Sequence, residues 1–250
     1  MKLLRRVNEP EVISEFLKNE FYQDEFHNDR AQFERLVLDA DIANGQENAL
    51  RRALLFRRRG HMWRELPADT QWWQVNFDPE DLRLIRVFPR AQWRRVSTGS
   101  FQLTDIAERI RDNHFDSKTR DFVAKVQALS YRLRRERDNS SVLLIGIDEH
   151  KPLTILEGNH RLTAAIMAGA EHLWNNFQIL CGFSSNMGSS CWYETNFANL
   201  FRYAQNRFRN LLYDRDADIE RALGDVPTGT SADRGLDVSM SARKAFPSSK

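Results

Sequence analysis

Apolar residues at helical spacing mark several stretches of the chain. Within each stretch they recur every three to four residues and leave the opposite face polar. This is the period of an amphipathic helix that packs by one face. Helices are therefore predicted over 8–22, 30–38, 47–59, 104–111 and 116–137, and Gly60 is expected to end the third of them.

Short runs of β-prone residues lie between the later helices. In 73–77 the apolar residues alternate with polar ones, which is typical of a half-buried strand. Continuous apolar runs predict further strands over 84–88, 141–147, 153–156 and 177–182. The polar residues 148–152 would turn the strand 141–147 back onto the strand 153–156 as a hairpin.

The C-terminal part of the chain contains one more amphipathic segment. A helix is predicted over about 191–212, with an apolar stripe that we expect to pack as core or as a lid on the domain; a dimer face is the alternative. The stripe consists of Phe197, Leu200, Phe201, Ala204, Phe208 and Leu211. Residues 226–250 are rich in Gly, Ser, Thr, Ala and Asp, so we expect this tail to be disordered.

Composition narrows the class of protein. Hydrophobic residues make up 41% of the 250 residues, which is enough for a core, and the net charge of +2 creates no general basic field for nucleic acid. No apolar run is long enough to span a membrane, and we expect no membrane contact. Cys181 and Cys191 form neither a disulfide framework nor a metal site, so we expect reduced thiols and a cytoplasmic location. Residues 1–6 lack the apolar core of a secretion signal.

Five arginines gather in the predicted helix over 47–59, at Arg51, Arg52, Arg57, Arg58 and Arg59. One interpretation is a patch that binds nucleic acid or polyphosphate. The other is a solvated face, with three of the arginines favourably placed near a helix C-terminus. We favour the solvated face, because few aromatic residues lie among these charges and the whole chain is nearly neutral.

The stretch 153–165 combines a strand, a glycine turn and a helix start. The strand runs into Glu157 and Gly158, and the helix that follows stops at Gly169. Free backbone N–H groups and the positive end of the helix dipole suit an anion such as phosphate there. Asn159 is expected to be the N-cap. The turn is therefore a candidate phosphate site.

Charged side chains equip this turn for chemistry. Arg161 offers a planar pair of donors to phosphoryl oxygens, and His160 donates a hydrogen bond or a proton near neutral pH. Glu157 is a candidate general base or Mg²⁺ ligand. Each residue also has a structural alternative: an exposed carboxylate at a helix dipole, a turn histidine, and an arginine paired with a surface acid.

The motif Glu-Gly-Asn-His-Arg-Leu at 157–162 resembles the G-x-H-R signature of the ParB/sulfiredoxin-like superfamily. This superfamily includes partition proteins, sulfiredoxins and free-serine kinases that use ATP or ADP. The resemblance implies an α+β fold with a small mixed sheet and helices, elaborated by helices at both ends. Its expected parts are a helical N-terminal extension (1–62), a nucleotide-binding core (63–185), a helical cap (186–225) and the tail (226–250).

Departures from the family narrow the expected activity. Sulfiredoxins carry a reactive cysteine at the position of Asn159, and partition proteins have a basic motif followed by a helix-turn-helix that we do not find here. The form of the motif is most similar to the free-serine kinases. The resemblance therefore implies that Glu157, His160 and Arg161 surround the nucleotide phosphates and the accepting hydroxyl.

The resemblance also implies further ligand contacts. A loop after the strand 84–88 would reach the nucleotide, and its Ser97, Thr98, Gly99 and Ser100 could wrap a phosphate, together with Gly158 and Asn159 of the turn. The expected co-substrate is ATP or ADP with Mg²⁺, and Glu157 is the candidate metal ligand.

The resulting hypothesis is a phosphotransferase that uses ATP or ADP and acts on a small amino-acid-like or metabolite substrate. One alternative is a ParB-like protein or nuclease that binds nucleic acid through the arginine clusters. Another is a nucleotide-sensing module without turnover. The sequence leaves open the acceptor substrate, the choice of nucleotide and the oligomeric state.

Overall fold

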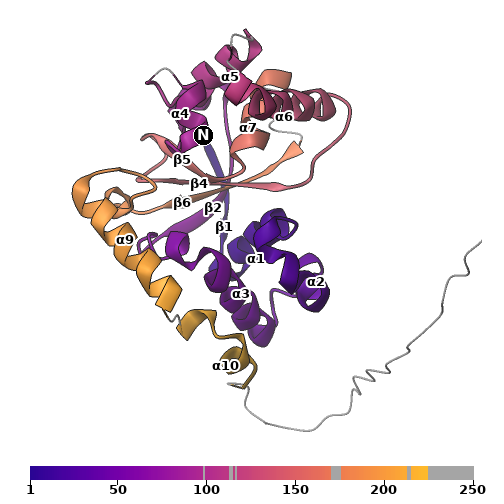
Figure 1. Cartoon of the computed structure of the whole chain (residues 1–250), viewed down its shortest axis with the longest axis vertical. Helices are drawn as coiled ribbons and strands as arrows, with labels where there is room; N and C mark the ends of the chain where they lie inside the picture. The colour runs from indigo at the N-terminus through magenta and orange to yellow at the C-terminus, as the bar shows by residue number, and fades with distance from the viewer. Residues whose placement is uncertain (98, 113–114, 116, 170–175, 213–214, 225–250) are drawn as a thin grey trace, which may run out of the picture.

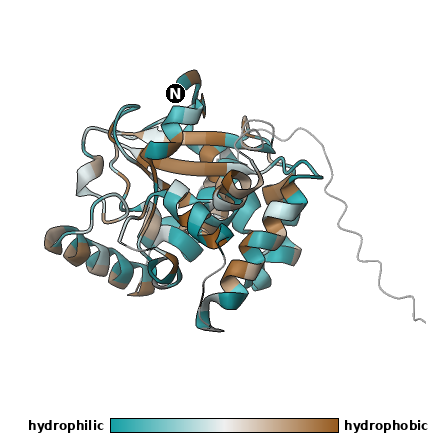
Figure 2. Cartoon of the chain, turned by 90° about the horizontal axis from the view of Figure 1, so that it is seen from above, coloured by the Kyte–Doolittle hydropathy of each residue, from teal (hydrophilic) through white to brown (hydrophobic). Residues whose placement is uncertain are grey.

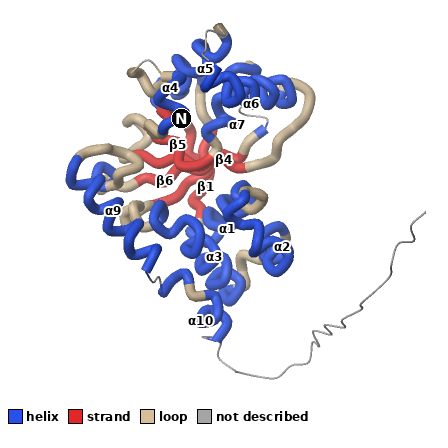
Figure 3. The backbone as a smooth tube through the Cα atoms, viewed as in Figure 1, coloured by secondary structure: helices blue, strands red, loops and turns tan. Residues whose placement is uncertain are grey.

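A six-stranded mixed sheet forms the middle layer of the molecule, and helices cover both of its faces (Figures 1 and 3). The computed structural model describes residues 1–224 except 98, 113–114, 116, 170–175 and 213–214. The expected combination of a mixed sheet with helices is thus confirmed. The narrower ParB/sulfiredoxin-like topology stays a prediction. The tail 226–250 lies outside the described residues.

The strands follow the order β1-β2-β6-β4-β5-β3 across the sheet. Neighbours β1–β2, β2–β6 and β4–β5 are antiparallel, whereas β4–β6 and β3–β5 are parallel. The hairpin of β4 and β5 and the return strand β6 agree with the sequence prediction. The bounds are β1 Lys2–Val7, β2 Gln71–Asn76, β3 Ile85–Val87, β4 Ser141–Gly146, β5 Leu153–Glu157 and β6 Gln178–Phe183.

Two helical layers bury the sheet. One contains α4 (Ala91–Val96), α5 (Leu103–Arg111), α6 (Ser117–Leu133) and α7 (Asn159–Ala168). The other contains α1 (Glu9–Glu20), α2 (Arg30–Leu38) and α3 (Gly45–Trp63), with α9 (Phe197–Leu212) and α10 (Ile219–Gly224) against α3. Short 3₁₀ turns complete the described part: η1 Asp24–Asp29, η2 Pro79–Leu84, η3 Met187–Ser189 and η4 Arg215–Ala217.

Strand β4 shows why both layers are needed. Val142 and Leu144 face the core on the α4–α7 side, while Leu143 and Ile145 face the core on the α1–α3 side. All four are fully buried. A strand covered on both faces has a continuous apolar sequence rather than an alternating one, which explains the brown central strands in Figure 2.

Most predicted elements form, and the differences have physical reasons. Helix α3 passes through Gly60 and ends at Trp63, so the predicted end at Gly60 is wrong; continuing the helix buries Met62 and Trp63. Strand β1 lies within the extension that we expected to be helical. It was missed because only Val7 of this edge strand is buried. The expected loop after β3 contains α4.

Helix α9 points its apolar stripe outward. Phe197, Phe201 and Phe208 are exposed, whereas the buried residues of this helix are Asn199 and Asn206. The prediction that the stripe packs as core or as a lid is therefore wrong. Hydrophobic spacing finds a helix but does not say which way the tertiary structure turns it.

The arginine cluster of α3 is engaged within the molecule. Arg52 pairs with Glu9 at 2.6 Å, and Arg59 pairs with Glu20 at 2.6 Å. Arg57 and Arg58 both pair with Asp29, at 3.1 and 2.7 Å. These four arginines bridge α3 to the elements around α1 and α2. Such bridges give no particular support to a nucleic-acid patch.

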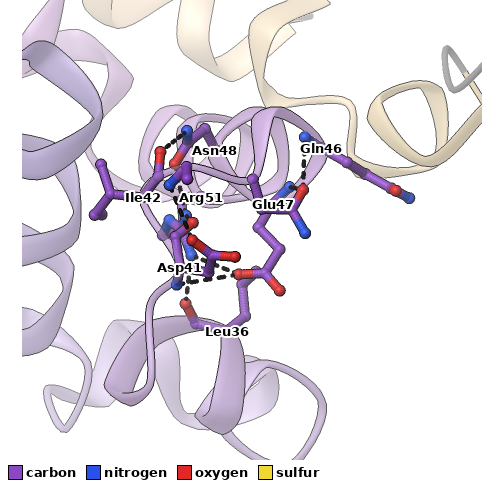
Figure 4. Close-up of polar contacts among 9 residues, drawn as sticks. Leu36, Asp41, Ile42, Gln46, Glu47, Asn48 and Arg51 are labelled. Carbon is purple, nitrogen blue, oxygen red and sulfur yellow. Dashed lines mark hydrogen bonds and ion pairs between the residues drawn. The ribbon is translucent and has the colours of Figure 1, made fainter.

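Arg51 differs from its neighbours because its side chain is fully buried. Figure 4 shows the polar contacts around it. Its guanidinium donates to the backbone carbonyls of Leu36 (3.0 Å) and Asp41 (2.7 Å). It also donates to the side chains of Glu47 (3.1 Å) and Asn48 (2.6 Å). A buried cation therefore holds the connection between α2 and α3, which neither sequence interpretation of the cluster anticipated.

Among the described residues, no helix is long and apolar enough to cross a membrane. The two cysteines, Cys181 and Cys191, are free and buried.

We predict that Arg51→Ala lowers the free energy of unfolding by about 3–5 kcal/mol, because the substitution removes the donor from several buried acceptors at once. Arg52→Ala is the matched control: it removes a largely exposed pair and should cost less than about 1 kcal/mol. Denaturant unfolding followed by circular dichroism measures both. Equal losses for the two variants would contradict the structural role assigned to Arg51.

Candidate functional site

The predicted strand–turn–helix unit forms as β5, Gly158 and α7. Gly158 is the N-cap with φ of 97°, and its carbonyl accepts the N–H of Leu162 at 2.9 Å. A Cβ on this residue would lie 3.0 Å from Val142. Glycine is therefore required here both by the left-handed backbone and by the close approach of β4. The expectation that Asn159 is the N-cap is wrong, because Asn159 is the first helical residue.

The start of α7 has no side-chain cap. Its first backbone N–H groups therefore keep their donor capacity, and the positive end of the helix dipole adds to it. The Oδ1 atom of Asn159 is buried and has no hydrogen-bond partner among the described residues. The turn thus presents free backbone N–H donors to an anion, and next to them lies an oxygen, Oδ1 of Asn159, that accepts no hydrogen bond from any described residue.

Glu157 and Arg161 form an ion pair next to this turn. The Nη2 atom of Arg161 donates to Oε2 of Glu157, and Nη1 donates to Oδ1 of Asn19 at 2.9 Å. Asn19 in turn donates from Nδ2 to Oε2 of Glu157 (2.8 Å) and to the carbonyl of Ser141 (2.7 Å). The structural alternative for Arg161 was an ion pair with a surface acid. Arg161 does form an ion pair, but its partner is Glu157 of the same motif.

Helix α1 takes part in the site from the opposite layer. Besides Asn19, it contributes Glu15, which accepts a hydrogen bond from the Ser141 hydroxyl. Glu15 also forms an ion pair with Lys18 at 2.9 Å. Sequence reasoning missed Asn19, because 138 residues separate it from Glu157 and no local pattern marks it. Only the folding of α1 over the end of the sheet brings the two together.

Burial gives Glu157 an unusual acidity. It raises the pKa of the carboxyl from 4.5 to about 7; the charge of Arg161 opposes this shift and that of Glu20 adds to it. The side chain keeps 13% of its surface exposed. Oε1 takes part in none of the described hydrogen bonds, so the carboxyl is poised to exchange a proton near neutral pH.

His160 stands at the rim of the turn between two aromatic rings. Its ring centroid lies 5.3 Å from that of Trp93 and 5.1 Å from that of Phe122. Burial against these rings lowers the pKa of His160, and the charges of Lys125, Arg161 and Arg90 lower it further. The imidazole is therefore neutral at neutral pH, and its nitrogens form no hydrogen bond with any described residue.

Three cations therefore act on His160 through their charges. Lys125 comes from α6 and Arg161 from α7, while Arg90 follows β3 and lies over the ring of Trp192 at 4.6 Å. No carboxylate among the described residues forms an ion pair with Lys125 or Arg90. Because strands β3 and β5 are parallel, their C-terminal ends lie at the same end of the sheet. Arg90, which follows β3, and the turn, which follows β5, therefore lie at that end together.

The loop 97–100, which was expected to contact phosphate, already has a hydrogen bond within the protein. The Ser100 hydroxyl donates to Asp105 at 2.5 Å and accepts from the N–H of Gln102, just ahead of α5. Gly99 has φ of 101°. Thr98 lies outside the described residues. A phosphate contact from Ser97, Gly99 or Ser100 stays a prediction, and Ser100 already has a structural partner.

A cavity of about 920 Å³ lies elsewhere, between β1, the end of α3 and α9. Arg5, Arg209, Trp63 and Trp72 are among its lining residues. None of its walls comes from the 157–161 turn. The two tryptophans stack with an interplanar angle of 11°, and Arg5 pairs with Glu11. Trp63, Trp72 and Arg5 thus already have partners within the wall of the cavity.

We predict a specific pH dependence of stability from Glu157. Between pH 4.5 and 7 the folded protein keeps a proton that the unfolded chain has lost, so the free energy of unfolding falls as pH rises through this window. The contribution is up to about 3 kcal/mol. Glu157→Gln abolishes it and adds a pH-independent loss at Arg161, so the stability gap between wild type and variant should move in the variant's favour from pH 5 to pH 8. A gap that stays constant in denaturant unfolding would contradict the raised pKa.

Comparisons with known proteins do not add a relative to these observations. No protein-family model matches the chain. Searches of curated proteins and of solved structures also give no match. The assignment of function therefore depends on the motif at 157–162 and on the geometry around it.

Proposed function

We propose that the turn between β5 and α7 binds a phosphoryl group and that the protein is a phosphotransferase using ATP or ADP. The observation that carries this proposal is the uncapped start of α7, with Arg161 held in its first turn; the charges of Lys125 and Arg90, which act on His160, add to it. Helix N-termini and unpaired cations favour anions, and phosphate is the anion that combines high charge with several acceptor oxygens.

The division of labour among the cations supports this assignment. Arg161 is held by Glu157 and Asn19, so its position is fixed before a ligand arrives. Lys125 and Arg90 are exposed and without a described carboxylate partner, so a phosphate would neutralise them without breaking an existing ion pair. Phosphoryl transfer depends mainly on such positioning and charge neutralisation.

Glu157 is the proposed general base. Its Oε1 would accept the proton of a substrate hydroxyl while the hydroxyl oxygen attacks the terminal phosphorus of the nucleotide. The bond from that phosphorus to the bridging oxygen breaks, and its electron pair leaves with the shortened nucleotide. A carboxyl with a pKa of about 7 matches this task, because half of the molecules carry the base form at neutral pH.

His160 and Asn159 would serve the two substrates. The neutral imidazole offers one N–H to a phosphoryl oxygen at the rim of the turn. The Oδ1 of Asn159 is buried and lacks a described donor; once its side chain turns outward, it would accept from the amine or hydroxyl of a small amino-acid-like acceptor. This extends the roles that the sequence motif implied for these residues.

Magnesium ligation by Glu157 fits the geometry less well than proton transfer does. The described residues contain no group of three or more His, Cys, Asp or Glu placed to hold a metal ion. Oε2 of Glu157 already accepts from Arg161 and Asn19. Mg²⁺ therefore enters the proposal only as the usual companion of nucleotide phosphates.

We predict that ATP or ADP with Mg²⁺ raises the melting temperature of the wild-type protein and that Arg90→Ala abolishes the shift. A ligand at about 100 times its Kd stabilises by about 2.7 kcal/mol. Arg95→Ala is the matched control, since it removes an exposed arginine from the adjoining helix and should keep the shift. The absence of a shift with ATP, ADP, CTP and GTP alike would remove the basis for a nucleotide enzyme.

We predict that Glu157→Gln keeps nucleotide binding but lowers turnover at least about 100-fold, the range for loss of a general base. Turnover is measured as nucleotide consumption with free serine and other hydroxyl-bearing amino acids. Normal turnover in the variant would refute the role of Glu157. Wild-type binding without any turnover would instead favour a nucleotide-sensing module.

A further inference from the structure

Helix α9 is attached to the molecule by its polar side. Asn206 donates to Oε1 of Glu65 at 2.6 Å, and Asn199 donates to the carbonyls of Gly188 (2.9 Å) and Glu194 (2.7 Å). Both asparagines are buried, and so is Glu65. Amide side chains in these places are matched donors for buried acceptors.

This attachment fixes the rotation of the helix. Oε2 of Glu65 also accepts the backbone N–H of Cys191 at 3.2 Å, which anchors the carboxylate to the segment before α9. Rolling α9 to bury its apolar side would leave the Glu65 carboxylate facing phenylalanine and leucine. A buried charge that loses a hydrogen-bond partner destabilises the fold by several kcal/mol. This is about as much as burial of the apolar side would stabilise it. The apolar side is therefore held outward.

The outward side forms a continuous surface that we call the α9 stripe. Phe197 is 93% exposed, Leu211 is 78% exposed and Phe201 is 67% exposed. The stripe consists of Phe197, Leu200, Phe201, Ala204, Phe208, Leu211 and Leu212. Helix α9 runs along the outer edge of the molecule and is seen in orange in Figure 1. An ordered apolar helix face of this kind marks an interaction surface.

The spacing within the stripe identifies the geometry of its partner. Positions 197, 201, 204, 208 and 211 follow one another at steps of four, three, four and three. This is the alternation of a and d positions along a helix–helix seam. The two ends of the stripe, Phe197 and Leu211, each lie seven residues from Ala204, the one small residue in the stripe. A second copy that crosses antiparallel at Ala204 therefore brings each end of one stripe against the opposite end of the other.

We propose that α9 is the centre of a two-fold symmetric dimer, in which the α9 helices of two copies pack antiparallel. Ala204 lies on the two-fold axis, where its small side chain lets the helices approach closely. Phe201 packs against Phe208 of the partner subunit, and Phe197 packs against Leu211 of the partner subunit. This departs from the core or lid packing that we expected from the sequence.

Charge and area are compatible with a second copy. Arg202 and Arg209 lie on the helix about 120° from the centre of the stripe, and only Arg207 flanks it. Antiparallel packing sets Arg207 near Leu200 of the partner subunit rather than near another arginine. The stripe presents on the order of 700 Å² of apolar surface. A standard interface needs about 800 Å² from each partner, so the stripe supplies most of a stable interface.

A double variant tests the interface without disturbing the fold. Phe201→Glu with Phe208→Glu changes exposed residues only, and it should weaken self-association at least about 100-fold, as expected for central aromatic contacts. Analytical ultracentrifugation should show a dimer for wild type and a monomer for the variant. Tyr131→Glu is the matched control, because it removes an exposed aromatic residue from α6 and should leave the dimer intact.

Cross-linking tests the symmetry. Ala204→Cys should form a disulfide-linked dimer under mild oxidation, because the two copies meet at this residue. Arg209→Cys should not, although it lies on the same helix. The native Cys181 and Cys191 are buried and should not contribute. Linkage through position 209 in preference to 204 would overturn the proposed arrangement.

A monomeric wild type at about 100 µM would also overturn the proposal, since a stable dimer has a Kd well below that concentration. Wild type that is monomeric and sediments with anionic phosphatidylserine vesicles through the stripe would assign this face to a membrane surface instead. A dimer that persists in the Phe201→Glu, Phe208→Glu variant would place the interface elsewhere.

Discussion

The burial of β4 and its neighbours on both faces is the constraint on which the structure depends. Val142 to Ile145 are fully buried, with alternate side chains in different cores. A sheet of this kind is stable only between two helical layers. The segment 91–168 supplies one layer around the hairpin, and α1–α3 supply the other. The N-terminal helices are therefore part of the same sandwich, and β1 joins them to the edge of its sheet.

The two layers meet at the end of the sheet that contains the C-terminal ends of β3 and β5. There, Asn19 of one layer contacts Arg161 and Glu157 of the other. The same contacts that fasten α1 over the sheet also orient the motif arginine and bury the motif glutamate. Structural and chemical interpretations of Arg161 are thus compatible: the ion pair holds its guanidinium in place at a helix start that remains open to an anion.

Helix α9 shows the opposite use of polar and apolar side chains. Buried asparagines attach it to Glu65, and its apolar residues face outward. In α7 the apolar residues Leu162 and Ala165 face the core, as the usual pattern requires. A hydrogen-bonded carboxylate in the interior reverses the expected orientation, because leaving it without a donor costs as much as the burial of an apolar face would contribute.

The sequence by itself determined the elements that local patterns specify. Periodicity located α1, α2 and the β4–β5 hairpin, and the Gly158 turn followed from a strand running into glycine before an amphipathic segment. It also identified Glu157, His160 and Arg161 as neighbours, because they share one turn. Only the tertiary structure decided which distant groups act on them: Asn19 contacts Glu157 and Arg161, and the charges of Lys125 and Arg90 lower the pKa of His160. It likewise decided that Arg51 is buried, that α3 continues through Gly60 and that the α9 stripe faces outward. These outcomes depend on which buried polar groups need partners, and a one-dimensional pattern does not contain that information.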